Sequence, residues 1–268
     1  MQATSDEIIH ERVLRGVMDA AARMNLNQSP PVMSQQIHRI VRNISRNKDP
    51  YRQVKDRFNR YALDIYPLCQ KMINRSSVSF ETAVRLAIAG NIIDFGPNSQ
   101  IGPSVIDETI DHALSGQLLG DIELLSKAVR SVDNILYLGD NCGEIVFDRL
   151  LIEQLPLHKV TFAVRGSSVI NDATLADAEA TGMTDLVKVI DNGSDAPGTI
   201  IENCSDAFRQ RFDRADLVIS KGQGNYEALS DVDKDIFFLL KAKCPLIAQY
   251  IGCDLGSPVI FSRVKKAA

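Results

Sequence analysis

The sequence predicts an α/β protein in which a helical N-terminal domain packs on a Rossmann-like α/β/α domain with a mainly parallel sheet. Two observations lead to this prediction. Residues 5–125 show the hydrophobic period of helices almost throughout. From Asn134 onward, short strand-like runs alternate with helical segments, which is the order of a parallel sheet with right-handed crossovers. We therefore expect a helical domain over 1–125 and an α/β domain over 126–268.

The N-terminal region contains four segments with the helical pattern. The first, residues 6–24, places its apolar side chains on one stripe, as in a helix packed on a core. The second begins with the Pro30-Pro31 pair, which is tolerated in the first turn of a helix. Residues 49–73 and 80–96 continue the same pattern.

The α/β region contains five expected strands, each a short apolar run. The segments between them carry helical patterning, with Asp172 and Thr199 near helix starts. This order implies a sheet with helices on both faces. The expected strands are ILYLG at 135–139, KVTFAVR at 159–165, LVKVI at 186–190, DLVISK at 216–221 and DIFFLLKAK at 235–243.

The composition excludes several classes of function. The 268 residues are 45% hydrophobic, and 30 Lys and Arg stand against 34 Asp and Glu, a formal net charge of -4. Such a chain has no strong electrostatic attraction for nucleic acid or an anionic membrane. No apolar run approaches the roughly 20 residues that cross a bilayer, and the acidic start is unlike a signal peptide. We expect a cytoplasmic protein whose partner is a small molecule or another protein.

The five cysteines form no C-x-x-C pair, which argues against a disulfide framework or a thiolate zinc site. We expect all of them, including Cys142 in the first strand-to-helix turn, to be reduced packing residues.

Polar residues follow the carboxyl ends of the expected strands, where ligands bind in an open parallel sheet. Asp140 and Asn141 follow the first strand, and Glu144 begins the next helix. The second strand ends in Arg165, with Asn171 and Asp172 shortly after it. The fourth and fifth strands end in cations, Lys221 on one and Lys241 and Lys243 on the other.

These residue types in this order point to phosphoryl chemistry. The hard oxygen ligands Asp140, Asn141 and Asp172 suit Mg²⁺ or Mn²⁺, ions that leave coordination positions for a substrate oxygen and water. Arg165, Lys221 and Lys243 suit the anionic oxygens of a phosphate.

Each element also has a purely structural interpretation when taken alone. Asp140-Asn141 is common turn chemistry, Asp172 is a plausible helix N-cap, and a lysine after a strand is usually solvated. Their combination at one edge of one sheet is what favours a site.

Several long stretches closely resemble motifs of the damage-control phosphatase family, in its archaeal and bacterial branch. The match covers nearly the whole chain, in the right order. The stretches are LGDNCGEIVFDRLL, VRGSSVINDATLADA, SKGQGNYEALSD, LLKAKCPLIAQYIG and AIAGNIIDFG.

The resemblance implies an active site between a helical domain and a Rossmann-like domain. It implies that Asp140, Asn141 and Asp172 hold Mg²⁺, Mn²⁺, Co²⁺ or Ni²⁺. It also places Asn91 and Asp94, the "GNxxD" element, beside metal and substrate. Lys243 takes the place of the family's phosphate-binding lysine, but Leu240 and Lys241 stand where the eukaryotic branch has an arginine and a small hydroxylated residue. That branch's substrate preference therefore does not carry over.

The resulting hypothesis is a metal-dependent phosphatase that hydrolyses phosphomonoesters of small metabolites such as sugar phosphates. Asp140, Glu144 and Asp172 are the expected catalytic residues, with Glu144 positioning water or acting as a base. Direct attack by water and an aspartyl-phosphate intermediate both stay open. The expected substrate-binding and phosphate-binding residues are Asn91, Asp94, Arg165, Asn171, Lys221, Asn225 and Lys243.

Two other functions stay open at this point. One is an S-adenosylmethionine-dependent carboxyl methyltransferase, since Rossmann-like sheets often bind that cofactor. The other is a non-catalytic phosphometabolite-binding protein, which predicts binding without phosphate release.

Overall fold

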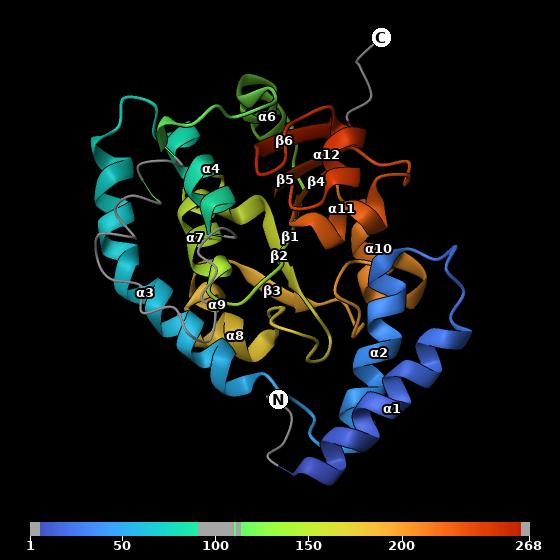
Figure 1. The fold of residues 1–268 in the computed structure, drawn as a ribbon. Helices are drawn as coiled ribbons and strands as arrows, with labels where there is room; N and C mark the ends of the chain where they lie inside the picture. The colour runs from blue at the N-terminus through green and yellow to red at the C-terminus, as the bar shows by residue number, and fades with distance from the viewer. Residues whose placement is uncertain (1–5, 91–109, 111–113, 264–268) are drawn as a thin grey trace.

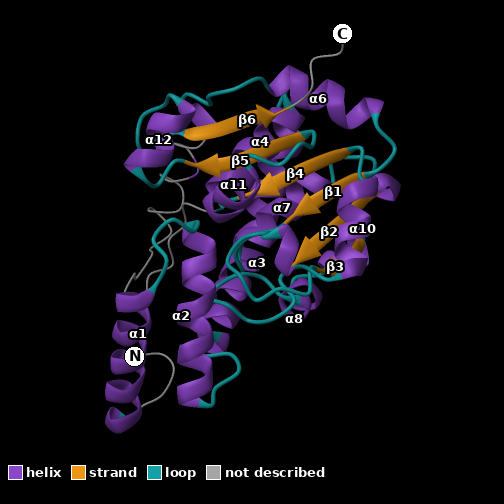
Figure 2. Cartoon of the chain, turned by 90° about the vertical axis from the view of Figure 1, so that its right-hand side faces the viewer, coloured by secondary structure: helices purple, strands orange, loops and turns teal. Residues whose placement is uncertain are grey.

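A six-stranded sheet runs through the described part of the chain, with its strands in the order β3-β2-β1-β4-β5-β6 (Figures 1 and 2). The structure is a computed structural model that describes residues 6–90, 110 and 114–263. Strands β1 to β5 run parallel, and β6 pairs antiparallel with β5. The predicted mainly parallel sheet is therefore confirmed. The strands are β1 Ile135–Leu138, β2 Val160–Val164, β3 Lys188–Asp191, β4 Leu217–Lys221, β5 Ile236–Lys241 and β6 Pro258–Arg263.

Helices make up the N-terminal region and connect the strands. None of the described helices is both long and apolar enough to cross a membrane. The α-helices are α1 Glu7–Arg23, α2 Pro30–Ser45, α3 Arg52–Arg75, α4 Ser79–Ala89, α6 Ile122–Ser131, α7 Glu144–Ile152, α8 Leu175–Ala180, α9 Met183–Leu186, α10 Asp206–Arg214, α11 Gln223–Leu229 and α12 Pro245–Ile251.

The two faces of the sheet have separate apolar cores, because successive residues of a strand point to opposite sides. Ile135 and Tyr137 of β1 pack in a core with α3, α4 and α7. Leu136 and Leu138 pack in a second core with α10, α11 and α12. Figure 1 shows these two sets of helices on opposite sides of the sheet. The predicted α/β/α layering is therefore confirmed, and it explains why the buried strands are continuously apolar.

Strand β6 lies outside the five expected strands. It follows α12 and returns along β5, with Pro258 opposite Lys241. An edge strand is covered less completely than a central one, so its sequence, PVIFSR, mixes apolar and polar residues. That mixture lacks the apolar run by which the other strands are recognised.

The N-terminal helices share a core with the sheet. Phe58 of α3 and Ala83 of α4 belong to the same apolar cluster as Tyr137 of β1. Helix α6 runs across the boundary expected between residues 125 and 126. The division into two domains stays a prediction, whereas the packing of a helical region on an α/β layer is observed.

Helix α1 packs differently from the other N-terminal helices. It contacts α2 and buries Val13, while Ile8 and Met18 are 72% and 62% exposed. The apolar face of α1 therefore packs on α2. The two helices form a hairpin that projects from the α/β layer in Figure 2.

One buried carboxylate, Asp177 in α8, ties α3 to the α/β layer. Lys55 Nζ lies 2.7 Å from Asp177 Oδ2, and Asn59 Nδ2 donates to Asp177 Oδ1 at 3.0 Å. The backbone N–H and the hydroxyl of Thr174 donate to Asp177 Oδ2 at 2.9 and 2.7 Å, which completes a capping box. Because Thr174 is the N-cap of α8, the interpretation of Asp172 as a helix cap is wrong.

We predict that Asp177→Ala lowers the free energy of unfolding by about 3–5 kcal/mol, because fully buried Lys55 loses its nearer counter-charge and keeps a more distant one, Asp49 Oδ2 at 3.7 Å. Urea unfolding at pH 7 measures this loss. The control is Asp185→Ala on α9, where the carboxylate is exposed and a change below about 0.5 kcal/mol is expected. Equal stability of the two variants would contradict the anchoring role of Asp177.

Candidate active site

Two carboxylates meet at the edge of the sheet where β1 and β2 end. Asp140 follows β1, and Asp172 lies in the segment after β2. The two segments run side by side, because Asn141 and Asp172 form an antiparallel bridge and Ala173 N donates to the Asp140 carbonyl at 2.8 Å. Neighbouring parallel strands end at the same edge, so residues far apart in sequence become neighbours here.

Arg165, at the end of β2, lies between these carboxylates. Its Nε donates to Asp172 Oδ2 at 2.6 Å, and its Nη2 donates to Asp140 Oδ1 at 3.3 Å. Its Nη1 donates to Thr199 Oγ1 at 3.3 Å and to Asn225 Oδ1 at 3.2 Å. Within the described ranges, these bonds leave one of the five guanidinium N–H groups for a ligand.

Glu144, the first residue of α7, is held from two sides. The Asn141 amide donates to Glu144 Oε2 at 3.0 Å and also to Asp140 Oδ2 at 2.8 Å. From the other side, Lys221 Nζ donates to Glu144 Oε1 at 2.8 Å. The same ammonium donates to Asp148 Oδ1 at 2.5 Å and to the Ala87 carbonyl of α4 at 2.8 Å.

The turn that carries Asp140 and Asn141 is fixed from α3. Gly143 adopts a positive φ of 74°, which a residue with a side chain rarely accepts, and its N–H donates to Asn59 Oδ1 at 2.7 Å. Since Asn59 also donates to Asp177, the helical region and the α/β layer share one hydrogen-bonded chain beside the site. This agrees with an active site that lies between the two regions.

Burial shapes the protonation of these groups. Burial raises the pKa of Asp140 well above its usual range, and the neighbouring charges of Asp172 and Glu144 raise it further. The charges of Arg165 and Lys243 only partly offset this effect. Burial likewise raises the pKa of Asp172, against the opposing effect of Arg165. Because these two carboxyls lie side by side, a cation bound between them would stabilise their ionised forms.

Comparison with known proteins identifies the family. Residues 1–259 match the model of the damage-control phosphatase ARMT1-like domain. This chain belongs to the damage-control phosphatase family. As a member it is a phosphatase, and enzymes of this family are generally metal-dependent.

Relatives of this damage-control phosphatase align along most of its length. An uncharacterized protein of Methanocaldococcus jannaschii is 37% identical over 98% of this chain and 90% of its own length. A damage-control phosphatase of Pyrococcus horikoshii is 34% identical over 96% of this chain and 90% of its own length. The crystal structure of a DUF89 family protein from Pyrococcus horikoshii superposes with a TM-score of 0.89 at 33% identity, covering 97% of this chain and 92% of that one.

The residues of this phosphatase fit a divalent cation. Asp140, Asp172, Glu144 and Asp148 are buried carboxylates, and two buried cations, Arg165 and Lys221, lie among them, so two negative charges remain when all are ionised. A Cβ at Gly222 would lie 2.0 Å from Asp140 Oδ2, and Gly222 has a φ of 80°, so only glycine leaves this space. The described residues contain no group of three His, Cys, Asp or Glu side chains with metal-binding geometry. Asp140, Asp172 and the Asn141 amide are the residues that could hold such an ion here.

Two of the expected phosphate-binding or substrate-binding residues are fully occupied within the protein. Lys221 is 0% exposed, and its three N–H donors serve Ala87, Glu144 and Asp148. Asn225 is also 0% exposed, and its amide bonds to Arg165, Thr199 and two backbone carbonyls. In this arrangement neither side chain lies at the open edge as expected, and both position other residues of the site.

The remaining expected residues lie nearer to solvent. Lys243 is exposed just after β5, close enough to Asp140 for its charge to act on the pKa of that carboxyl. Asn171 is half-buried, and its carbonyl accepts from Cys142 N at 2.8 Å. Asn91 and Asp94 lie outside the described residues.

Cys142, between Asn141 and Gly143, is 3% exposed, and burial raises the pKa of its thiol. All five cysteines are free. Their expected role as reduced packing residues is consistent with this arrangement.

Sequence reasoning missed three residues that shape the site. Asp148 accepts from the Tyr137 hydroxyl at 2.7 Å as well as from Lys221. Its spacing of four residues from Glu144 on a mostly apolar helix was a usable signal. Tyr137, within an apolar strand, and Asn59, on a helix distant in sequence, give no such signal.

We predict that Lys221→Met lowers the free energy of unfolding by about 3–5 kcal/mol at pH 8, because Glu144 and Asp148 become buried charges without a counter-charge. Even with Lys221 present, burial raises the pKa of Asp148 to about 6. The folded state therefore favours the protonated carboxyl, and this group's contribution to stability falls as the pH rises through 6. The loss in Lys221→Met should accordingly be smaller at pH 5 than at pH 8.

Urea unfolding at both pH values measures this difference, with Lys188→Met at the exposed start of β3 as the control. If Lys221 served mainly to hold a phosphoryl oxygen, its replacement would instead raise KM and leave the free energy of unfolding unchanged.

Proposed function

We propose that this chain hydrolyses phosphomonoesters of small metabolites, with sugar phosphates as the substrate class, in the cytoplasm. We further propose that Asp140, Asn141 and Asp172 hold the divalent ion, which is Mg²⁺, Mn²⁺, Co²⁺ or Ni²⁺. The observation that carries this proposal is the pair of buried carboxylates, Asp140 and Asp172, brought together by a backbone bridge at the edge of the sheet.

A divalent ion bound there would polarise a phosphoryl oxygen and lower the pKa of a bound water. The chain's own residues supply the remaining functions. Glu144, oriented by Asn141 and Lys221, is the proposed group that positions water or accepts its proton. The unused N–H of Arg165 and the exposed ammonium of Lys243 are the proposed contacts to the other phosphoryl oxygens.

The substrate's hydroxyl groups are the proposed partners of the polar residues beside the phosphate. Asn171 is half-buried at this edge, and no other described side chain occupies its amide. We retain Asn91 and Asp94 in the proposal on the family resemblance alone. Asn225 is proposed to act through Arg165.

We expect a chelator-stripped protein to release no phosphate, and at least one added divalent ion to restore release from p-nitrophenyl phosphate and from sugar phosphates. Asp172→Ala should lower kcat/KM by about 10²–10³-fold, because the site loses a ligand and a charge in the transition state. Asp172→Asn keeps the size of the side chain and separates loss of charge from loss of packing. Asp185→Ala serves as the surface control.

Two outcomes would contradict this proposal: no tested metal restores phosphate release, or Asp172→Ala retains wild-type activity. The other functions predict different results. A methyltransferase would bind S-adenosylmethionine in titration calorimetry without phosphate. A non-catalytic binding protein would be stabilised by phosphometabolites and would release no phosphate with any metal.

A further inference from the structure

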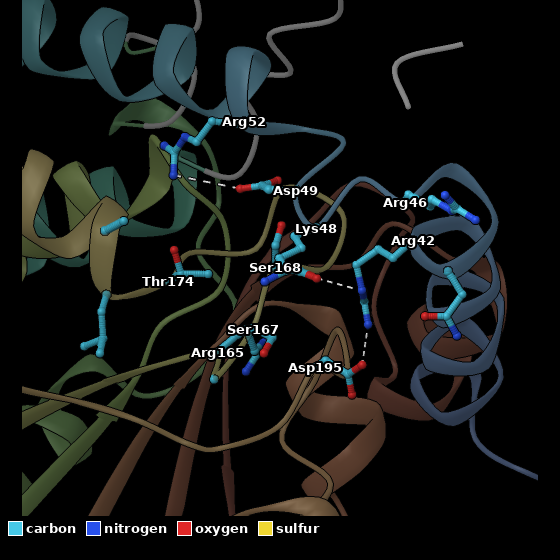
Figure 3. A pocket seen from close by; sticks show the side chains of 14 residues that line it. Arg42, Arg46, Lys48, Asp49, Arg52, Arg165, Ser167, Ser168, Thr174 and Asp195 are labelled. Atoms are coloured by element: carbon cyan, nitrogen blue, oxygen red, sulfur yellow. Dashed lines mark hydrogen bonds and ion pairs between the residues drawn. The ribbon is translucent and has the colours of Figure 1, made fainter. Parts of the chain in front are cut away.

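A cavity of about 750 Å³ opens beside Arg165, between the corner that joins α2 to α3 and the loop after β2 (Figure 3). A volume in this range accommodates a small metabolite. Five cations and two carboxylates line it, so its wall is positive overall. The cations are Arg42, Arg46, Lys48, Arg52 and Arg165, and the carboxylates are Asp49 and Asp195.

Four cations of this wall fall into two groups, and the fifth, Arg165, bonds to Asp140 and Asp172. Arg42 and Arg52 are paired: Arg42 with Asp195 and with the Ser168 carbonyl at 2.7 Å, and Arg52 with Asp177 at 2.7 Å. Arg46 and Lys48, in contrast, are exposed at the cavity, and no carboxylate of the described residues pairs with either of them. Two positive charges are therefore available to a ligand.

Arg165 connects this cavity to the two carboxylates. It forms part of the cavity wall, and its guanidinium bonds to both Asp140 and Asp172. Asp140 and Asp172 are not among the residues that line the cavity, so a substrate with its reacting phosphoryl group at these carboxylates would extend past Arg165 to reach Arg46 and Lys48.

We propose that this cavity binds a second phosphate of the substrate, so that the preferred substrates are small metabolites with two phosphate groups. The inference rests on the proposed function, because it assigns the reacting phosphate to the site at Asp140 and Asp172. Arg46 and Lys48 bind the second phosphate by charge-assisted hydrogen bonds.

The test compares two competitors of p-nitrophenyl phosphate hydrolysis by the full chain with its activating metal. Fructose 6-phosphate and fructose 1,6-bisphosphate differ by one phosphate. For the wild type, we expect the inhibition constant of the bisphosphate to be about tenfold lower than that of the monophosphate. Because Arg46 and Lys48 are exposed, this preference should shrink as the ionic strength rises.

The double variant Arg46→Ala with Lys48→Ala should bring the ratio of the two inhibition constants close to one. The matched control is Arg12→Ala with Lys188→Ala, which removes an exposed arginine and an exposed lysine far from the cavity in sequence and should keep the wild-type ratio. All four side chains are exposed, so the variants should fold.

A wild-type ratio near one, or a double variant that retains the preference, would overturn the inference while leaving the phosphatase proposal intact. A wild-type protein that hydrolyses no p-nitrophenyl phosphate with any metal would instead refute the proposed function, and the inference with it.

Discussion

The charge balance of one buried cluster governs the architecture of this site. Asp140, Asp172, Glu144 and Asp148 form ion pairs with two buried cations, Arg165 and Lys221. Buried charge is costly unless each group is paired and hydrogen-bonded, and here almost every donor and acceptor is used. The negative charge that remains is the physical reason why we propose that this site holds a divalent cation.

The helical region does more than cover the sheet, because it fixes the backbone that presents these acids. Asn59 of α3 accepts from Gly143 in the turn after β1, and Lys55, one helical turn earlier, pairs with Asp177 of α8. From α4, the Ala87 carbonyl accepts from Lys221. A shift of either helix would therefore displace the turn that carries Asp140 or the lysine that holds Glu144.

The buried cations and the exposed cations around this site have different roles. Lys221 and Arg165 are buried, and nearly all of their N–H donors are used to orient carboxylates and amides. Arg46 and Lys48 are exposed and pair with no carboxylate of the described residues, so a phosphate can reach them without breaking the internal network; Lys243 is exposed as well. A phosphatase must bind an anion and release phosphate in every turnover, and exposed cations suit that exchange because their pairing energy is moderated by water.

The α/β layering, the five parallel strands and the acids at their carboxyl ends could be predicted from the sequence alone, because hydrophobic period and strand order are local signals. Strand β6 could not, because its mixed run lacks that signal, and neither could the directions in which Lys221 and Asn225 point. A side chain at a strand end can face the ligand or the interior, and the sequence does not distinguish the two. The folded structure was needed to place Lys221 beneath the site and Arg46 and Lys48 in the wall of a cavity beside Arg165. Those placements depend on contacts between segments far apart in the chain, and such contacts do not produce a hydrophobic period in the sequence.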